Sequence, residues 1–270
     1  MSTDVAEPAE PPEPPKPPKP EPKRTGPFRV FAETVVLVVV AVVLALVVKT
    51  FLVQAFYIPS ESMEPGLQVN DRILVEKPSY WFGGQPQRGD VIVFSDPGWG
   101  VEDDGGTATN PVTKLLAKIG LYPTGGHLVK RVIGVGGDTV HCCDIRGRIT
   151  VNGQPLNEDG FIADAACDGP MEQDEGDYAR GGCKGWTAKV PAGRLFVMGD
   201  NRGDSADSSY HLCSPPRLKR AKSDPDLAAT CAKAYVPESL VVGKVVAVVW
   251  PASHFRFEHR PATFADVPAA

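Results

Sequence analysis

The sequence predicts an all-β domain of mainly antiparallel sheets, preceded by one N-terminal transmembrane helix. Two patterns lead to this prediction. The run "TVVLVVVAVVLALVV" at residues 34–48 carries no charged residue, and long uncharged apolar runs are typical of helices that cross a bilayer. After residue 57, short segments rich in β-branched residues, such as "RILVEK" and "DVIVF", alternate with Gly, Pro, Asp and Asn. That alternation indicates strands joined by turns.

The first 27 residues are dominated by proline. Their run "EPAEPPEPPKPPKPEPK" contains few apolar groups that could be buried, and proline has no backbone N–H donor. We therefore expect residues 1–27 to be a disordered, polyproline-II-like cytoplasmic tail. A proline-rich docking peptide for a partner domain is the alternative.

Residues 28–56 are expected to form the transmembrane helix. The apolar run is shorter than the roughly 20 residues that span the hydrocarbon, so the flanking residues must complete the span. Lys23, Arg24 and Arg29 precede the run, and the positive-inside rule then places the N-terminus in the cytoplasm. The expected protein is a single-pass protein of the plasma membrane. A cleaved signal peptide is the competing interpretation, but no clean small-x-small cleavage site follows the run.

Residues 57–262 are expected to form one extracytoplasmic β domain, with a C-terminal tail at 263–270. Two polar stretches interrupt the strand pattern. We interpret them as insertions on the β scaffold: a β-rich cap region at 141–190 and a cysteine-containing insertion at 211–235.

All six cysteines follow the apolar run, which fits disulfides in an oxidising exterior. They are Cys142, Cys143, Cys167, Cys183, Cys213 and Cys231. The spacing slightly favours the local loops 167–183 and 213–231, although many pairings stay open. The adjacent Cys142 and Cys143 could bond each other only with strain.

Charge and motif spacing exclude two classes of function. The formal net charge is −5, which leaves no basic face to neutralise phosphates, so we expect no nucleic acid as partner. The run "HCCD" at 141–144 lacks the spacing of zinc ligands. No metal and no cofactor are expected.

A catalytic serine needs a neighbouring base. The five histidines stand in no recognisable triad motif and the chain has no G-x-S-x-G elbow, although a Ser-His-Asp site stays open. Lys130 in "HLVKRVIGV" is the other candidate, because burial on an apolar strand could lower its pKa from about 10.4 to about 7–8, roughly 4 kcal/mol of differential interaction. The competing interpretation places Lys130 on the solvated face of a half-buried strand.

Four segments in order resemble the conserved boxes of one family. They are "YIPSESMEPGLQVNDRILVEK" (57–77), "RGDVIVF" (88–94), "KRVIGVGGDTV" (130–140) and "MGDNRGDSADS" (198–208), and "YVPESLVVGKV" (235–245) is similar to the closing segment of the same family. The family is the type I bacterial signal peptidases, membrane-bound Ser/Lys proteases that release exported proteins. The resemblance covers roughly residues 30–250, and four ordered motifs behind one anchor are specific.

The resemblance implies a role for each matching residue. Ser62 is similar to the family's nucleophile and Lys130 to its general base. Ser60 resembles the serine whose hydroxyl joins the amide of Ser62 as an oxyanion donor, and Ser205 resembles the serine that orients the lysine. Further supporting positions are Met63, Arg131, Asp200, Arg202 and Asp207.

The chain departs from the family pattern at three positions. Gly66 and Asn70 replace the commoner Thr and Gly, and Ser209 stands where an arginine often stands. The last change puts in doubt an ion pair between Asp207 and that position.

The activity implied is the removal of N-terminal signal peptides after small residues in an A-x-A pattern. Expected partners are the signal peptides of exported pre-proteins, the lipid bilayer and the secretion translocon. Pro59 stiffens the chain after the span, so we expect Ser62 close to the lipid surface. The alternatives are a non-catalytic membrane-anchored β-domain that binds envelope partners and a self-cleaving Ser/Lys repressor, which the apolar span disfavours.

Overall fold

The computed structural model describes residues 27–47, 52–81, 83–100, 126–163, 185–213 and 215–270. The chain divides into two units, Met1–Leu44 and Ala45–Ala270. The predictions for the proline tail and for a disulfide between Cys167 and Cys183 lie outside the described residues.

The N-terminal unit contains helix α1 (Pro27–Val47). Its segment Phe28–Leu46 is long and apolar enough to cross a membrane, as the sequence predicts. The predicted helix continued to residue 56, whereas α1 ends at Val47 and residues 53–57 form a strand. The reason is pairing: each residue of that strand has a partner on the neighbouring strand, which satisfies its backbone groups without a helix.

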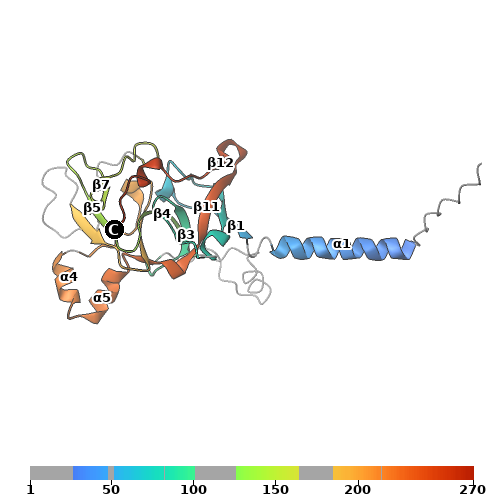
Figure 1. Cartoon of the computed structure of the whole chain (residues 1–270), viewed down its shortest axis with the longest axis horizontal. Helices are drawn as coiled ribbons and strands as arrows, with labels where there is room; N and C mark the ends of the chain where they lie inside the picture. Colours follow the sequence, from blue (N-terminus) through green and yellow to red (C-terminus); the bar gives the residue numbers. More distant parts are fainter. Residues whose placement is uncertain (1–26, 48–51, 82, 101–125, 164–184, 214) are drawn as a thin grey trace, which may run out of the picture. The chain divides into compact units, whose positions relative to one another are not determined.

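The second unit is built on two antiparallel sheets, so the predicted all-β class is confirmed (Figure 1). The larger sheet runs β1-β2-β11-β3-β4-β9-β10, with β12 paired to β11. Its strands are β1 (Val53–Tyr57), β2 (Arg72–Glu76), β3 (Val91–Ser95), β4 (His127–Gly134), β9 (Arg194–Met198), β10 (Val236–Pro237), β11 (Val241–Trp250) and β12 (Arg256–Phe257). The smaller sheet runs β7-β6-β5-β8, from β5 (Thr139–Cys142), β6 (Thr150–Val151), β7 (Gln154–Pro155) and β8 (Trp186–Lys189).

The larger sheet has a packed core on each face. Strand β3 shows this, because Val91 and Val93 pack in one buried cluster and Ile92 and Phe94 in another. Alternate residues of a strand point to opposite faces, so a strand buried on both faces reads as a continuous apolar run. This explains why "VIVF" does not alternate with polar residues.

Strand β4 positions the central lysine. It pairs with β3 on one side and with β9 on the other, and Arg131 lies opposite Met198 in the register with β9. Because β9 ends at Met198, the segment that follows it emerges beside residues 130 and 131. The motifs "KRVIGVGGDTV" and "MGDNRGDSADS" therefore lie side by side in the fold.

The insertion at 211–235 is helical rather than extended. Helices α4 (Pro215–Ala221) and α5 (Pro225–Ala232) form a hairpin at the edge of the unit (Figure 1). Asp224 caps α5, and its Oδ1 accepts from the backbone N–H groups of Asp226 and Leu227 at 3.1 Å, an interaction that stabilises a helix start. The remaining short helices are α2 (Pro78–Trp81), η2 (Glu61–Met63), η3 (Arg202–Asp204), η4 (Glu238–Leu240), η5 (Ala252–His254) and η6 (Ala262–Phe264).

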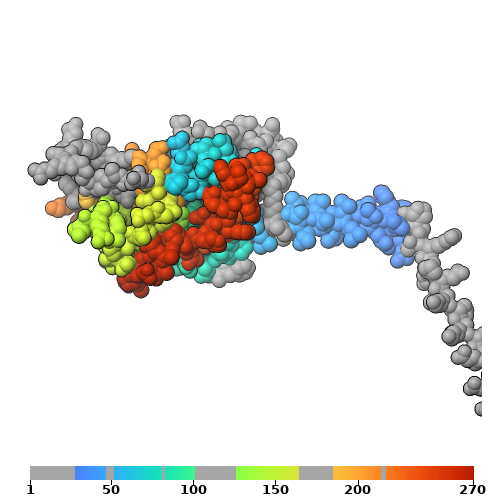
Figure 2. Space-filling view, turned by 90° about the horizontal axis from the view of Figure 1, so that it is seen from above, coloured from blue at the N-terminus to red at the C-terminus, as the bar shows by residue number. Residues whose placement is uncertain are grey.

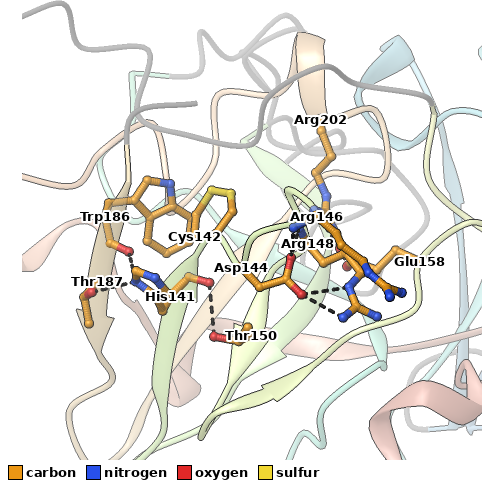
Figure 3. Close-up of a disulfide and its surroundings, with 11 residues drawn as sticks. His141, Cys142, Asp144, Arg146, Arg148, Thr150, Glu158, Trp186, Thr187 and Arg202 are labelled. Carbon is orange, nitrogen blue, oxygen red and sulfur yellow. Dashed lines mark hydrogen bonds and ion pairs between the residues drawn. A yellow bond between two sulfur atoms is a disulfide. The ribbon is translucent and has the colours of Figure 1, made fainter. Parts of the chain in front are cut away.

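Two disulfides lie in the described part of the chain. Cys213 and Cys231 are joined across the α4–α5 hairpin with a Cα–Cα distance of 5.3 Å, which confirms the predicted 213–231 loop. Cys142 and Cys143 are joined as well, a pairing that the sequence analysis expected only with strain. Figure 3 shows this second disulfide at the end of β5 beside the ring of Trp186, with which Cys142 shares a buried cluster.

The C-terminal residues 263–270 pack onto the β domain rather than standing apart as a tail. Phe264 and Val267 are buried in the cluster that underlies the smaller sheet. Asn152 donates from Nδ2 to the carbonyl of Pro268 at 2.9 Å. In the space-filling view the end of the chain, from β11 onward and coloured in shades of red, forms a continuous band across one face of the unit (Figure 2).

Candidate active site

The turn that carries Ser62 follows β1 and is held by the backbone and by apolar side chains. The Ile58 N–H donates to the Asp71 carbonyl, and the Asn70 N–H donates to the Ile58 carbonyl, both at 2.9 Å. Ser62 lies in η2 between the exposed Glu61 and Met63, which is 1% exposed. Burial of Ile58 and Met63 on either side fixes the backbone that presents the Ser62 hydroxyl.

Asn70 occupies a position that requires a left-handed backbone. Its φ is 75°, a region that glycine adopts without cost and that asparagine tolerates better than most residues. The Asn70 Oδ1 also accepts a hydrogen bond of 2.6 Å from the Tyr57 hydroxyl. The departure from the commoner glycine therefore keeps the turn.

Lys130 and Ser62 are brought into direct contact. The Nζ of Lys130 lies 2.5 Å from the Oγ of Ser62 in a hydrogen bond, and Lys130 is only 3% exposed. Burial lowers the pKa of Lys130 to about 8, although the negative charges of Asp207, Asp200 and Asp204 oppose this shift. A buried amine with this pKa is neutral in a large fraction of molecules near pH 8.

Ser60 lies next to the same hydroxyl. The two oxygens, Ser60 Oγ and Ser62 Oγ, are 3.2 Å apart, and Ser60 is the extended residue immediately before η2. Ser60 is exposed to solvent. The geometry brings together three of the predicted groups, Ser60, Ser62 and Lys130.

Arg131 follows Lys130 in β4 and pairs with Asp200 in the loop after β9. Its Nε and Nη2 donate to the two oxygens of Asp200 at 2.8 and 2.7 Å, and its Nη1 donates to the Gly89 carbonyl at 2.9 Å. Nη2 also reaches Glu258 Oε1 at 3.2 Å, and the guanidinium lies 4.8 Å from the centre of the Phe161 ring. This buried bidentate pair fixes the start of the 199–209 loop against β4.

The same loop contacts the backbone of the Ser62 turn. The Asn201 N–H donates to the Ser62 carbonyl at 3.1 Å, and Asn201 Nδ2 donates to the Glu61 carbonyl at 3.2 Å. Sequence reasoning did not single out Asn201, although it lies inside the matched motif "MGDNRGDSADS". Asn201 therefore links the 199–209 loop directly to the turn that carries Ser62.

Arg202 anchors the loop to the cap region. Its Nε donates to the Gly199 carbonyl at 2.9 Å and its Nη1 donates to Glu158 Oε2 at 3.3 Å. Both side chains are buried. Sequence reasoning missed Glu158, because the segment "NEDG" is typical of a solvated turn. Its spacing does not indicate that Glu158 is the buried ion-pair partner of Arg202.

Ser205 and Asp207 form a third buried group. The Ser205 hydroxyl donates to Asp207 Oδ2 at 2.7 Å. Among the described contacts, the hydrogen-bond partner of Lys130 is Ser62, so the orienting role expected of Ser205 stays a prediction. In the described part of the chain, no group of three or more His, Cys, Asp or Glu side chains is arranged to hold a metal ion.

Comparison with known proteins finds relatives of this chain among the signal peptidases. The family model described as "Signal peptidase, peptidase S26" matches residues 31–250. A signal peptidase I of Mycobacterium tuberculosis is 42% identical over 248 residues, which cover 87% of this chain and 76% of the relative. A signal peptidase I of Leptolyngbya laminosa is 34% identical over 252 residues, with 93% and 94% covered.

A similar solved structure is a signal peptidase I from Enterococcus faecalis. The two chains share 22% identity with a TM-score of 0.31, and the match covers 59% of this chain and 96% of the other.

Proposed function

The chain belongs to the signal peptidase family, peptidase S26, and on this premise we propose that it is a membrane-bound serine endopeptidase with a Ser-Lys dyad. It removes N-terminal signal peptides from exported pre-proteins after small residues. Ser62 is the nucleophile and Lys130 the general base. The observation that carries the proposal is the 2.5 Å contact between Lys130 Nζ and Ser62 Oγ, made by an amine that is almost fully buried.

The first step is acyl transfer to Ser62. Neutral Lys130 takes the hydroxyl proton of Ser62, and the serine oxygen attacks the carbonyl carbon of the scissile peptide bond. The negative charge that develops on the carbonyl oxygen is stabilised by the Ser62 N–H and the Ser60 hydroxyl. The protonated Lys130 then gives its proton to the leaving amine, which becomes the new N-terminus of the exported protein.

The second step restores the enzyme. The signal peptide is now joined to Ser62 Oγ through an ester, and Lys130 is neutral again. Lys130 removes a proton from a water molecule that attacks the ester carbonyl, and the same proton returns to Ser62 Oγ as the ester bond breaks. The signal peptide leaves with a new carboxylate.

The apolar surroundings of Ser62 support a preference for small residues. Ile58, Met63 and Leu67 belong to one buried cluster, and Val129 packs against it. A packed apolar wall leaves little volume for a side chain, and overpacking excludes large groups. The small-residue preference is inferred from this packing together with the family.

The proposed membrane arrangement rests on α1 and its flanking charges. The helix anchors a single-pass protein in the plasma membrane, with the N-terminus in the cytoplasm and the β domain outside, because the basic residues precede the apolar segment. The proposed partners are signal peptides, the lipid bilayer and the secretion translocon.

Cleavage of a purified pre-protein by the detergent-solubilised full chain tests this function. We expect the wild type to release a product whose new N-terminus follows a small residue, and Lys130→Ala to release none. Lys189→Ala, which removes an exposed lysine of β8, is the matched control and should cleave like the wild type. Cleavage at the same bond by Lys130→Ala would contradict the proposed dyad.

A further inference from the structure

The carboxylate of Asp207 is 2% exposed and receives hydrogen bonds from neutral donors. Its Oδ2 accepts from the Gly199 N–H at 2.9 Å and from the Ser205 hydroxyl at 2.7 Å. Its Oδ1 accepts from the N–H and the hydroxyl of Ser209 at 2.9 and 2.7 Å. Four such bonds fix the orientation of the carboxylate. Within the described residues, no salt bridge reaches Asp207.

The two other acidic residues of the loop are in different surroundings. Asp200 shares a bidentate pair with Arg131, which also binds Glu258, so a cation offsets its charge. Asp204 is exposed on η3, where water screens its charge. Asp207 is buried, and no cation contacts it among the described residues. Of the three carboxylates, Asp207 should therefore have the strongest electrostatic effect on Lys130.

Among the residues that the structure describes, the other elements around Lys130 bring no competing charge into contact with it. Strand β3 places the apolar Ile92 opposite Lys130, and β9 ends in the buried Met198. From η2 the contact is the Ser62 hydroxyl, while Glu61 is exposed. The nearby Arg202 is engaged with Glu158.

From this arrangement we propose that Asp207 is a positioning residue that sets the working pH of the site, because its buried and unneutralised carboxylate opposes the loss of the proton from Lys130. The inference rests on the proposed role of Lys130 as general base. The order of the electrostatic influences on the pKa of Lys130 agrees with it: Asp207 acts most strongly, followed by Asp200 and Asp204. Ser209 holds the Asp207 carboxylate through a neutral hydroxyl and so leaves the charge of the carboxylate in place. A cation at position 209 would cancel that charge.

Asp207 also has a mechanical connection to the reacting groups. Gly199, whose N–H it binds, packs directly between the Ser62 carbonyl oxygen and the Ser205 side chain, so that even one additional carbon on Gly199 would collide with both. A displaced Asp207 carboxylate would move Gly199 and, through it, the Ser62 turn. The two effects can be separated, because only the electrostatic one changes the pH dependence.

The test is the pH profile of kcat/KM for the detergent-solubilised full chain on a peptide that contains a signal-peptide cleavage site. Asp207→Asn keeps the shape of the side chain and removes its charge. We expect the acidic limb, which reports deprotonation of Lys130 in the free enzyme, to move to lower pH by about one unit. Asp204→Asn should move it in the same direction by less, and the exposed Asp226→Asn of α5 should leave it in place.

A second pair of variants covers the case in which Asp207→Asn fails to fold, since an amide cannot accept all four hydrogen bonds. Ser209→Arg places a cation at the carboxylate and should also move the limb to lower pH, whereas Ser209→Thr keeps the hydroxyl and should not. A limb that stays in place while kcat and the melting temperature fall together would show a merely structural role and overturn the inference. A larger shift for Asp204→Asn than for Asp207→Asn would overturn it as well. Either result leaves the proposed function intact, because that function is tested separately by the loss of cleavage in Lys130→Ala.

Discussion

Strands β4 and β11 each place a lysine in an apolar segment of the same sheet. Both Lys130 and Lys244 are paired in register with Ile92 of β3, one from each side. Lys244 forms a 2.9 Å salt bridge with Asp90, and its side chain is 20% exposed. Lys130 is 3% exposed, and its hydrogen-bond partner is the neutral hydroxyl of Ser62. A carboxylate stabilises the ammonium form of a lysine, whereas a hydroxyl in a dry site leaves the amine able to lose its proton.

This difference shows that apolar neighbours in the sequence do not by themselves make a lysine into a base. Both lysines lie in segments rich in apolar residues, "HLVKRVIGV" and "LVVGKVVAVVW", and the second is the more apolar of the two. Tertiary packing brings a serine hydroxyl to Lys130 and a carboxylate to Lys244, and this difference between the two lysines can be tested.

Removal of the partner of Lys130 should have the largest effect. Ser62→Ala deletes the proposed nucleophile, so turnover should fall by about 10⁶-fold. Ser62→Cys should retain little activity, because its sulfur is larger and the site is built around an oxygen. Quantification of cleaved pre-protein by gel electrophoresis measures both, and robust turnover by Ser62→Ala would remove Ser62 from the chemistry.

Exchange of each lysine for arginine compares the two strands directly. Lys130→Arg should lose activity as completely as Lys130→Ala, to below the limit of detection, because a guanidinium is not deprotonated at usable pH. Lys244→Arg can still pair with Asp90 and should remain within a few-fold of the wild type. Initial rates on one peptide substrate give this comparison, and substantial activity of Lys130→Arg would contradict the role of Lys130 as base.

Loss of the side-chain oxyanion donor should have a smaller effect. Ser60→Ala leaves the Ser62 N–H in place but removes one hydrogen bond to the developing charge, which typically costs about 10²–10³ in kcat. The expected pattern is a lower kcat with little change in KM. A change confined to KM would mean that Ser60 contributes only to binding.

A change of pH should have a smaller effect than any of these substitutions. With the pKa of Lys130 lowered to about 8, kcat/KM should rise as pH increases through 8. Stability follows the same sign: between about 8 and the higher pKa of the unfolded chain, the unfolded state binds more protons, so the free energy of unfolding rises with pH through the Lys130 contribution. Chemical denaturation at several pH values checks the second statement, and Lys130→Met should abolish this contribution.

Much of the fold could be predicted from local patterns. The strands of the large sheet correspond to β-branched runs such as "RILVE" and "VIVFS", because burial of one or both faces leaves a direct trace in composition. The α4–α5 hairpin was missed, since its basic and small residues carry no clear helical stripe of apolar side chains. The end of α1 was placed too late because the pairing of β1 with β2 is a long-range property.

The candidate site could be predicted in part through the resemblance of its motifs. Ser62 and Lys130 lie where the family pattern places them, and the contact between them could not be read from periodicity. Asn201 and Glu158 escaped prediction because their roles depend on backbone and side-chain partners supplied by distant segments. The donors to Asp207 likewise become visible only when the loop folds back on itself.

Titration of the Lys130 amine itself tests most directly whether Lys130 can act as a base. Nuclear magnetic resonance of the detergent-solubilised chain with ¹³C-labelled lysine, with the Lys130 signal assigned by its disappearance in Lys130→Arg, follows the side chain as pH is raised. We expect a midpoint at about 8, because burial lowers the pKa of Lys130. A Lys130 signal that remains that of an ammonium group at pH 10 would contradict it.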